Sequence, residues 1–181
     1  MEAAVIPDRP IVVTGLMGSG KTSVARILAA ELGRELRDSD PDISARYDGA
    51  TAAETAAAVG AEELHRREAE HLAWALAQRP APVIAAAASV VDGPDCRAVL
   101  KAATVVWLDA PPATLAERML SGAHRPHFEP DLEAMLTKQR ARRGPLFTEV
   151  ADLIFDVSAL SPEEVASRVL ASLGAEPSGE E

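Results

Sequence analysis

The stretch Gly15-Leu16-Met17-Gly18-Ser19-Gly20-Lys21-Thr22 matches the phosphate-loop pattern G-x-x-x-x-G-K-[ST]. A β-branched run from Ile11 to Val13 precedes it and predicts a buried strand. Apolar residues recur at helical spacing from Val24 to Leu32 and predict a helix that leaves the loop. This order of strand, loop and helix is the context that the motif requires, so it disfavours the alternative of a chance glycine turn.

The residue types of the loop suit a bound phosphate chain. Glycines let backbone N–H groups turn inward, and the helix N-terminus adds free N–H groups and a positive dipole end. Lys21 would reach the β- and γ-phosphates, and the Thr22 hydroxyl would ligate Mg²⁺. We therefore expect ATP or a close relative, with Mg²⁺, as cofactors. The residues predicted to contact the nucleotide here are Gly15, Met17, Gly18, Ser19, Gly20, Lys21, Thr22 and Ser23.

Length and composition set limits on the class of protein. The chain has 181 residues, of which 48% are hydrophobic and 25% charged, which predicts a single α/β domain over residues 1–181. A net charge of -10 argues against a nucleic-acid partner but not against a small anion held by a few arginines. No apolar run has the length of a membrane span, and the N-terminus lacks the features of a signal peptide. We expect a cytoplasmic monomer that acts on a small molecule.

Apolar runs and turn residues alternate along the chain in a way that predicts a parallel sheet with helices on both faces. We expect a helix from Leu132 to Arg143, a last helix up to Leu173, and a disordered tail from Gly174 to Glu181. The fold class is therefore α/β of the P-loop kinase type, with a five-stranded sheet. The predicted strands are Ile11–Val13, Glu35–Asp38, Pro82–Ala85, Thr104–Asp109 and Leu153–Val157.

Two carboxylates, Asp38 and Asp40, stand at the carboxyl end of the second predicted strand. In an open α/β sheet, ligands bind at that edge. A Mg²⁺ nucleotide also needs oxygen ligands nearby. The alternative is that Asp40 caps a helix that begins at Pro41, which is a favourable N-cap and N1 pair. Both roles are compatible.

Three other features have a functional and a structural interpretation. The segment around residues 121–131 has loop composition and contains Arg125, which suits a mobile lid over phosphates as well as an ordinary surface loop. The basic end of the predicted helix at Arg143 could simply complement the helix dipole. His65 and His71 lie on a predicted helix, where histidine is more often structural than catalytic.

From Ile11 to Val157 the chain resembles the shikimate kinase family, and four motifs carry this resemblance. The phosphate loop is close to the family form, and Asp38-Ser39-Asp40 matches the family's Asp-Thr-Asp. Arg125-Pro126 resembles the Arg-Pro of the lid. Arg143-Gly144-Pro145-Leu146-Phe147 resembles Arg-x-Pro-Leu-Tyr.

The resemblance implies roles for individual residues. Asp38 would help hold Mg²⁺ through water, so Thr22 and Asp38 are the metal residues. Asp40 would bind the acceptor hydroxyl and take its proton. Arg118 would pack on adenine, and Arg125 would contact the transferred phosphate. Arg143 would bind the acceptor carboxylate. Lys21, Asp40 and Arg125 are thus the implied catalytic residues.

The acceptor half departs from the family pattern. The family has Gly-Glu-x-x-Phe-Arg-x-x-Glu where this chain has residues Gly60–Glu68, with His65 in place of the arginine and Leu64 in place of the aromatic residue. Thr55-Ala56 replaces Ile-Phe, and Ala86-Ala87-Ala88-Ser89 replaces Gly-Gly-Gly. A neutral histidine does not reproduce a bidentate arginine contact with a carboxylate. We therefore expect His65 in an altered acceptor site.

The sequence thus predicts an ATP- and Mg²⁺-dependent small-molecule kinase, with shikimate or a related small hydroxy acid as the acceptor. One alternative is a kinase for a different polyol or small metabolite. Another is a degenerate ATP-binding protein without catalysis. Retention of Asp38, Asp40 and Arg125 disfavours the second alternative, because a protein that only binds ATP needs neither an acceptor carboxylate nor a lid arginine.

Overall fold

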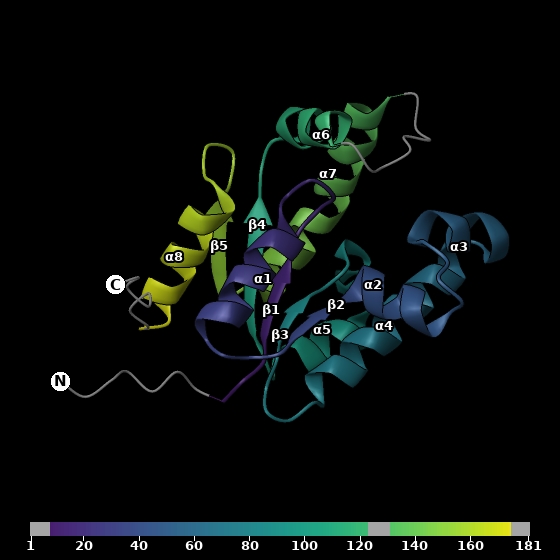
Figure 1. Ribbon diagram of the computed structural model, residues 1–181. Helices are drawn as coiled ribbons and strands as arrows, with labels where there is room; N and C mark the ends of the chain where they lie inside the picture. The colour runs from purple at the N-terminus through teal and green to yellow at the C-terminus, as the bar shows by residue number, and fades with distance from the viewer. Residues whose placement is uncertain (1–7, 123–130, 175–181) are drawn as a thin grey trace.

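A five-stranded sheet lies at the centre of the computed structural model, which describes residues 8–122 and 131–174 (Figure 1). The strand order is β2-β3-β1-β4-β5, and every neighbouring pair is parallel. The prediction of a parallel five-stranded sheet is therefore confirmed. The strands are β1 (Ile11–Thr14), β2 (Leu36–Asp38), β3 (Val83–Ala85), β4 (Thr104–Asp109) and β5 (Leu153–Asp156).

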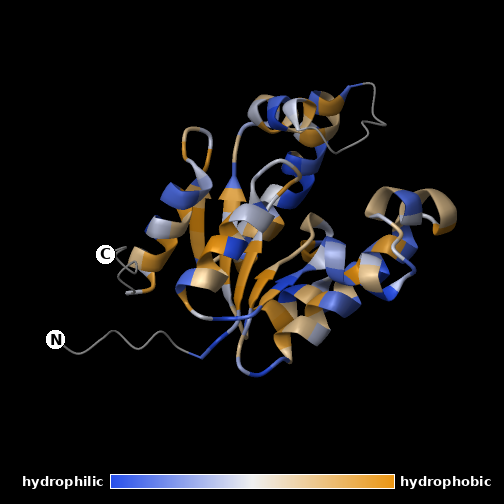
Figure 2. Cartoon of the chain, viewed as in Figure 1, coloured by the Kyte–Doolittle hydropathy of each residue, from blue (hydrophilic) through white to orange (hydrophobic). Residues whose placement is uncertain are grey.

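Helices cover both faces of this sheet. Helices α1 and α8 pack against each other on one face, while α4, α5 and α7 lie on the other (Figure 1). The strands β1, β3 and β4 are largely apolar, whereas β2 carries Arg37 and Asp38, and polar residues are frequent on the helices (Figure 2). The helices are α1 (Lys21–Glu31), α2 (Ser39–Arg46), α3 (Ala52–Val59), α4 (Ala61–Leu76), α5 (Pro94–Leu100), α6 (Pro112–Ser121), α7 (Leu132–Val150) and α8 (Pro162–Ser172), with a short 3₁₀ helix η1 (Ala88–Val91).

The core is centred on β1 and β4, whose apolar residues are buried on both faces as in other covered parallel sheets. Trp107 of β4 stacks on Phe147 of α7, with ring centroids 5.2 Å apart and planes 19° apart. Phe147 is only 1% exposed. This stack fixes α7 against the central part of the sheet.

Helix α7 is longer than predicted. It was expected to end at Arg143 but runs to Val150 and contains Pro145. A proline inside a helix removes one hydrogen bond and favours a break. Here the buried residues Leu136 and Phe147 hold the helix on both sides of the proline. Arg143 therefore lies within the helix, and the interpretation of its charge as a complement to a helix C-terminus is wrong.

The carboxyl ends of the parallel strands meet at one edge of the sheet. The phosphate loop follows β1, Asp38 ends β2, and Ala86 follows β3, which lies between them. The register pairs Ala85 with both Val13 and Asp38, and the Ala86 amide donates to the Val13 carbonyl at 3.0 Å. This edge therefore brings the loop and the Asp38–Asp40 carboxylates together. Within the described ranges, no helix is both long and apolar enough to cross a membrane.

Candidate active site

The phosphate loop packs directly against β4 and α6 through its glycines. Gly15 and Gly18 have φ angles of 149° and 83°, in a region that favours glycine. A Cβ atom on Gly15 would lie 2.4 Å from the Leu108 carbonyl oxygen, and one on Gly18 would lie 2.8 Å from that of Leu115. Side chains are thus excluded at both positions, and the loop keeps the tight backbone path that a phosphate chain requires.

Lys21 starts α1 and lies over the loop. Its Nζ donates to the carbonyl oxygens of Gly15 at 2.9 Å and Leu16 at 3.1 Å. Thr22 and Ser23 follow in the first turn, whose backbone N–H groups have no partner within the helix. This arrangement places a positive charge and helix N–H donors at the loop, which fits a polyphosphate.

Buried hydroxyl groups near the loop also fit a polar ligand. In the part of the chain that the structure describes, the hydroxyls of Thr14, Ser19 and Ser39 are buried and have no hydrogen-bond partner. Buried polar groups are nearly always hydrogen-bonded, so unpartnered ones at one edge indicate a missing polar partner. Ser19 belongs to the phosphate loop, and Ser39 lies between the two carboxylates.

The residue that caps the helix after β2 is Asp38 and not Asp40. Helix α2 begins at Ser39, and Asp38 is its N-cap, with its Oδ1 accepting from the Asp40 amide at 3.4 Å. The alternative interpretation, in which Asp40 caps a helix that begins at Pro41, is therefore wrong. Asp38 has the extended backbone conformation of an N-cap residue, and its side chain accepts a hydrogen bond from the first turn of α2, in which Asp40 itself lies. Asp40 lies in that first turn, at the sheet edge.

A magnesium site fits this edge. Over residues 8–122 and 131–174, no group of three or more His, Cys, Asp or Glu side chains gathers to hold a metal. Mg²⁺ on a nucleotide needs only one or two protein oxygens, because phosphates and waters complete its octahedron. The hydroxyl of Thr22, in the first turn of α1, and the carboxylate of Asp38, at the end of β2, are oxygen donors of this kind.

Glu68 is a buried carboxyl that the sequence analysis missed. It lies on α4, is 7% exposed, and accepts a hydrogen bond from the Ser89 hydroxyl of η1. Burial raises its pKa above the ordinary value, and the charge of Asp40 adds to this, against the Ser89 hydrogen bond and the charges of Arg143 and Lys21. Asp40, Arg143 and Lys21, whose charges act on Glu68, belong to three other helices. One sequence feature could have indicated this buried carboxyl: Glu68 falls on the same face of the helix as the apolar residues Leu64 and Leu72.

Arg143 is buried and forms an ion pair that the sequence did not reveal. The arginine is 7% exposed, and its Nε and NH2 donate to Asp92 Oδ1 at 2.9 Å and Oδ2 at 2.7 Å. Burial alone would raise the pKa of Asp92, but hydrogen bonds and charges of Arg143 and Arg142 keep it below the ordinary value. Asp92 is thus an anion that directly follows η1.

His65 lies near this ion pair, on α4. Removal of water from its ring lowers its pKa, and the positive charge of Arg143 lowers it further. At neutral pH the imidazole is therefore uncharged and adds no second cation beside Arg143. His65 is an exposed residue of α4 within electrostatic range of Arg143, and the arginine itself is paired with Asp92.

The remaining predicted residues lie at or beyond the loop. Arg118 is on α6, the helix against which Gly18 packs, and its NH2 donates to the carbonyl oxygens of Val157 at 2.5 Å and Ser158 at 3.3 Å. Its guanidinium is thereby held against the segment after β5. Arg125, at the centre of the predicted lid, lies outside the described residues. The same holds for the predicted tail beyond Gly174.

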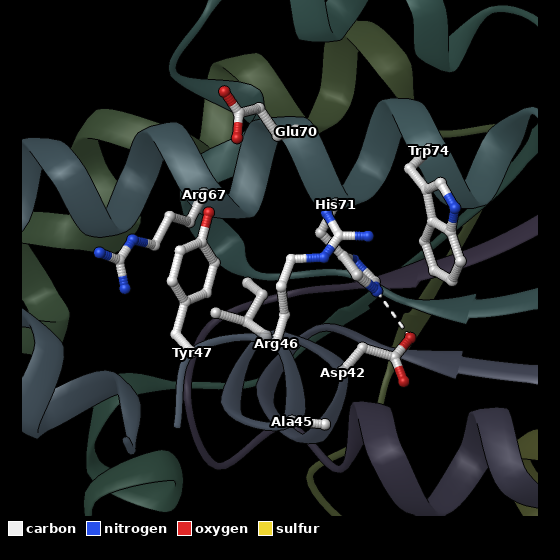
Figure 3. Close-up of a pocket in the computed structure, with 9 residues that line it drawn as sticks. Asp42, Ala45, Arg46, Tyr47, Arg67, Glu70, His71 and Trp74 are labelled. Carbon is white, nitrogen blue, oxygen red and sulfur yellow. Dashed lines mark hydrogen bonds and ion pairs between the residues drawn. The ribbon is translucent and has the colours of Figure 1, made fainter. Parts of the chain in front are cut away.

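A hollow between α2 and α4 contains none of the predicted site residues (Figure 3). His71 is 5% exposed and lies 2.8 Å from Asp42 through its Nε2, while Arg67 lies over the ring of Tyr47 at 3.7 Å. These contacts join the helix that carries Asp40 to the helix that carries Glu68. The structural interpretation of His71 is therefore correct. The hollow is lined by Asp42, Ile43, Ala45, Arg46, Tyr47, Arg67, Glu70, His71 and Trp74.

Gly18→Ala tests the backbone path of the loop. We expect ATP affinity to fall by about tenfold or more, because the new Cβ would meet the Leu115 carbonyl and positive φ costs about 1–3 kcal/mol at such a residue. Gly33→Ala is the matched control, since Gly33 also has a positive φ of 60° but no neighbour within 4 Å of the new Cβ. Calorimetric titration with ATP measures both. Equal ATP affinities in the two variants would contradict a loop shaped by this contact.

Glu68→Gln tests the buried carboxyl through stability. Because the pKa of Glu68 is raised in the folded protein, the folded state binds the proton more tightly than the unfolded state. Wild-type stability should therefore decline relative to Glu68→Gln as pH rises from the ordinary carboxyl range through the raised pKa. Urea unfolding of both proteins between pH 4 and pH 8 measures the difference. A constant difference across this range would contradict the raised pKa.

Comparisons with a family model and with individual relatives lead to the same protein family. A family model described as shikimate kinase matches residues 17–174. A shikimate kinase of Symbiobacterium thermophilum is 36% identical over 166 residues, which cover 90% of this chain and 95% of that protein. One from Synechococcus is 36% identical over 167 residues, or 91% of this chain and 86% of that protein.

A solved structure agrees with these relatives. The shikimate kinase of Acinetobacter baumannii, in complex with shikimate, superposes with a TM-score of 0.83 at 31% identity and covers 91% of this chain and 92% of its own. A gluconokinase of Sinorhizobium meliloti has a TM-score of 0.55 at 24% identity, which shows a shared fold alone. The family model and the identity of the relatives lead to one conclusion: this chain belongs to the shikimate kinase family, whose members are small-molecule kinases.

Proposed function

We propose that this protein transfers the γ-phosphoryl group of Mg²⁺-bound ATP to a hydroxyl of shikimate. The observation that carries the proposal is the meeting of the phosphate loop, over which Lys21 lies, with Asp38 and Asp40 at the carboxyl edge of the sheet. Lys21 would be the phosphate-binding cation and Asp40 the carboxylate that faces the acceptor, and the buried Arg143 would bind an anionic group of the acceptor. The acceptor is proposed because the family's relatives are named shikimate kinases and the Acinetobacter structure holds shikimate.

The phosphate loop and its neighbours would bind the nucleotide. The loop amides and Lys21 would hold the β- and γ-phosphates, and Arg118 would pack on adenine. Mg²⁺, when bound, neutralises phosphate charge during transfer. Thr22 and Asp38 would hold it. Arg125 is proposed to contact the transferred phosphate from the lid.

Asp40 would act on the acceptor. Its carboxylate would accept the proton of the acceptor hydroxyl, whose oxygen then forms a bond to the γ-phosphorus. The bond from that phosphorus to the bridging oxygen breaks, and ADP leaves with the electron pair. Asp40 suits this role by its position, because it lies in the first turn of α2, at the sheet edge that also carries the phosphate loop. Arg143 would hold the acceptor carboxylate through hydrogen bonds from its guanidinium.

The other hypotheses are less well supported. A kinase for a different polyol would explain the departures at Leu64, His65 and Ala56, but the family model and the relatives favour shikimate. A non-catalytic ATP-binding protein would have no use for a carboxylate at the sheet edge beside its phosphate loop. The cytoplasmic monomer without a nucleic-acid partner stays a prediction.

ADP release with Mg²⁺ and ATP, with and without shikimate, tests the proposed reaction. We expect strong stimulation by shikimate, and Asp40→Asn should lower kcat by about 100-fold or more with nearly unchanged ATP affinity. Asp48→Asn is a matched control, since Asp48 is an exposed carboxylate whose positive φ asparagine tolerates. Absence of stimulation by shikimate in the wild type would refute this acceptor. Retained transfer in Asp40→Asn would refute the role of Asp40 alone.

His65→Arg tests whether position 65 faces the acceptor. A charged arginine would add charge-assisted hydrogen bonds to an anionic acceptor, each worth about 1.5–3 kcal/mol. The KM for shikimate should therefore fall by about tenfold or more, while the KM for ATP stays unchanged. His65→Gln, which has no charge, is the control and should leave both constants close to wild type. Equal KM values for shikimate in the two variants would place residue 65 outside the acceptor site.

A further inference from the structure

The ion pair between Asp92 and Arg143 uses the contact surface that an acceptor carboxylate would need. Nε and NH2 of the guanidinium bind the two carboxylate oxygens side by side, at 2.9 and 2.7 Å. The third nitrogen, NH1, lies 3.4 Å from Gln139 Oε1. Bidentate pairing of this kind is the strongest arrangement between arginine and a carboxylate. Asp92 therefore occupies the part of Arg143 with the best geometry for binding a carboxylate.

A second carboxylate has little room beside this pair. The side chain of Arg143 is only 8% exposed, so water does not separate groups that share it. Two carboxylates on one buried guanidinium would repel each other in a medium of low dielectric constant. The neighbouring His65 is uncharged at neutral pH and does not offset this repulsion. Binding of an anionic acceptor at Arg143 thus requires Asp92 to leave.

Asp92 has a second partner to which it can move. Its Oδ2 also accepts from NH2 of Arg142 at 2.6 Å, and the Arg142 side chain is 63% exposed. Two hydrogen bonds hold the backbone of Asp92 in place. Its amide donates to the Ser89 carbonyl at 2.9 Å, and its carbonyl accepts from Arg97 at 3.2 Å. A change of partner therefore needs only a rotation of the Asp92 side chain.

We propose that Asp92 is an internal competitor for the acceptor carboxylate: it pairs with Arg143 in the free protein and stays with Arg142 when an acceptor binds. The inference rests on the proposed function in one respect, namely that Arg143 binds a carboxylate of the acceptor. The competition lowers the apparent affinity for the acceptor in proportion to the fraction of protein molecules in which Arg143 is not paired with Asp92. Asp92 is thus a specificity-determining residue, since the exchange weakens binding of anionic acceptors but not of ATP.

The test is the dissociation constant of cyclohexanecarboxylate, measured by calorimetry on the full chain. This probe has a carboxylate on a six-membered ring and no hydroxyl, so its binding is independent of phosphoryl transfer. Asp92→Asn should bind it at least about fivefold more tightly than wild type, the lower end of typical coupling between sites. Equal affinity, weaker affinity, or no binding to either protein would overturn the proposal, because a merely structural Asp92 would orient Arg143 and its loss would weaken binding.

Arg142→Ala completes a double-mutant cycle. The variant removes the second partner of Asp92, so the probe should bind more weakly than to Arg168→Ala, an exposed arginine on α8 that controls for the lost charge. In the Asp92→Asn background the effect of Arg142→Ala should largely disappear. An undiminished effect would overturn the exchange. If Asp92→Asn does not fold, the comparison of Arg142→Ala with Arg168→Ala decides, and equal affinities overturn it.

Failure of the proposed function gives a different result. A wild type without shikimate-dependent ADP release would refute shikimate as the acceptor and would leave the probe affinities as the measure of the exchange. Conversely, shikimate turnover together with equal probe affinities in wild type and Asp92→Asn would keep the function and overturn the exchange. ATP affinity and thermal unfolding, measured for each variant, show that the nucleotide half is intact.

Discussion

The close contact between the phosphate loop and the ends of β4 and α6 is the constraint on which the rest of the site depends. Gly15 and Gly18 bring backbone against the carbonyl groups of Leu108 and Leu115, at distances that leave no space for a Cβ. This contact fixes the direction in which α1 leaves the loop and therefore the position of Lys21. The parallel register then sets Asp38 and Ala86 beside the same loop. The nucleotide half is thus determined by backbone packing rather than by side-chain contacts.

The region around Glu68 and Arg143, which is part of the proposed acceptor site, depends on electrostatics between buried groups instead. A carboxyl, Glu68, and a guanidinium, Arg143, are both almost fully enclosed, and each has a specific partner, Ser89 and Asp92. Buried charges of this kind are stable only when they are paired or hydrogen-bonded. A substitution at either residue therefore alters the electrostatic environment of its partner as well as the packing around it.

Much of the fold and of the nucleotide site could be predicted from the sequence. Two apolar runs, Ile11–Val13 and Thr104–Asp109, could be interpreted only as buried strands. The phosphate-loop motif in turn requires a strand before it and a helix after it at fixed spacing. The end of α7 could not be predicted, because Pro145 argues locally for a break and only the packing of Phe147 overrules it. The pair of Asp92 and Arg143 is separated by 51 positions, so no local pattern reveals it. The cap of α2 could not be decided from the sequence, because Asp40 before Pro41 is also a favourable cap and only the structure shows Asp38 in that position.

The unbroken helix α7 has a consequence for how acceptor preference could change over evolutionary time. Arg143 and Phe147 are one turn apart on the same rigid element, and Phe147 is stacked on Trp107 in the centre of the sheet. The backbone of Arg143 is therefore held in place as firmly as that of a core residue, and more firmly than a residue on a surface loop would be. Insertions or deletions in the connecting segments would leave it in place. Under the proposed function, new acceptors would therefore be accommodated by exchanging the side chains that face α7, such as Asp92, rather than by remodelling the backbone.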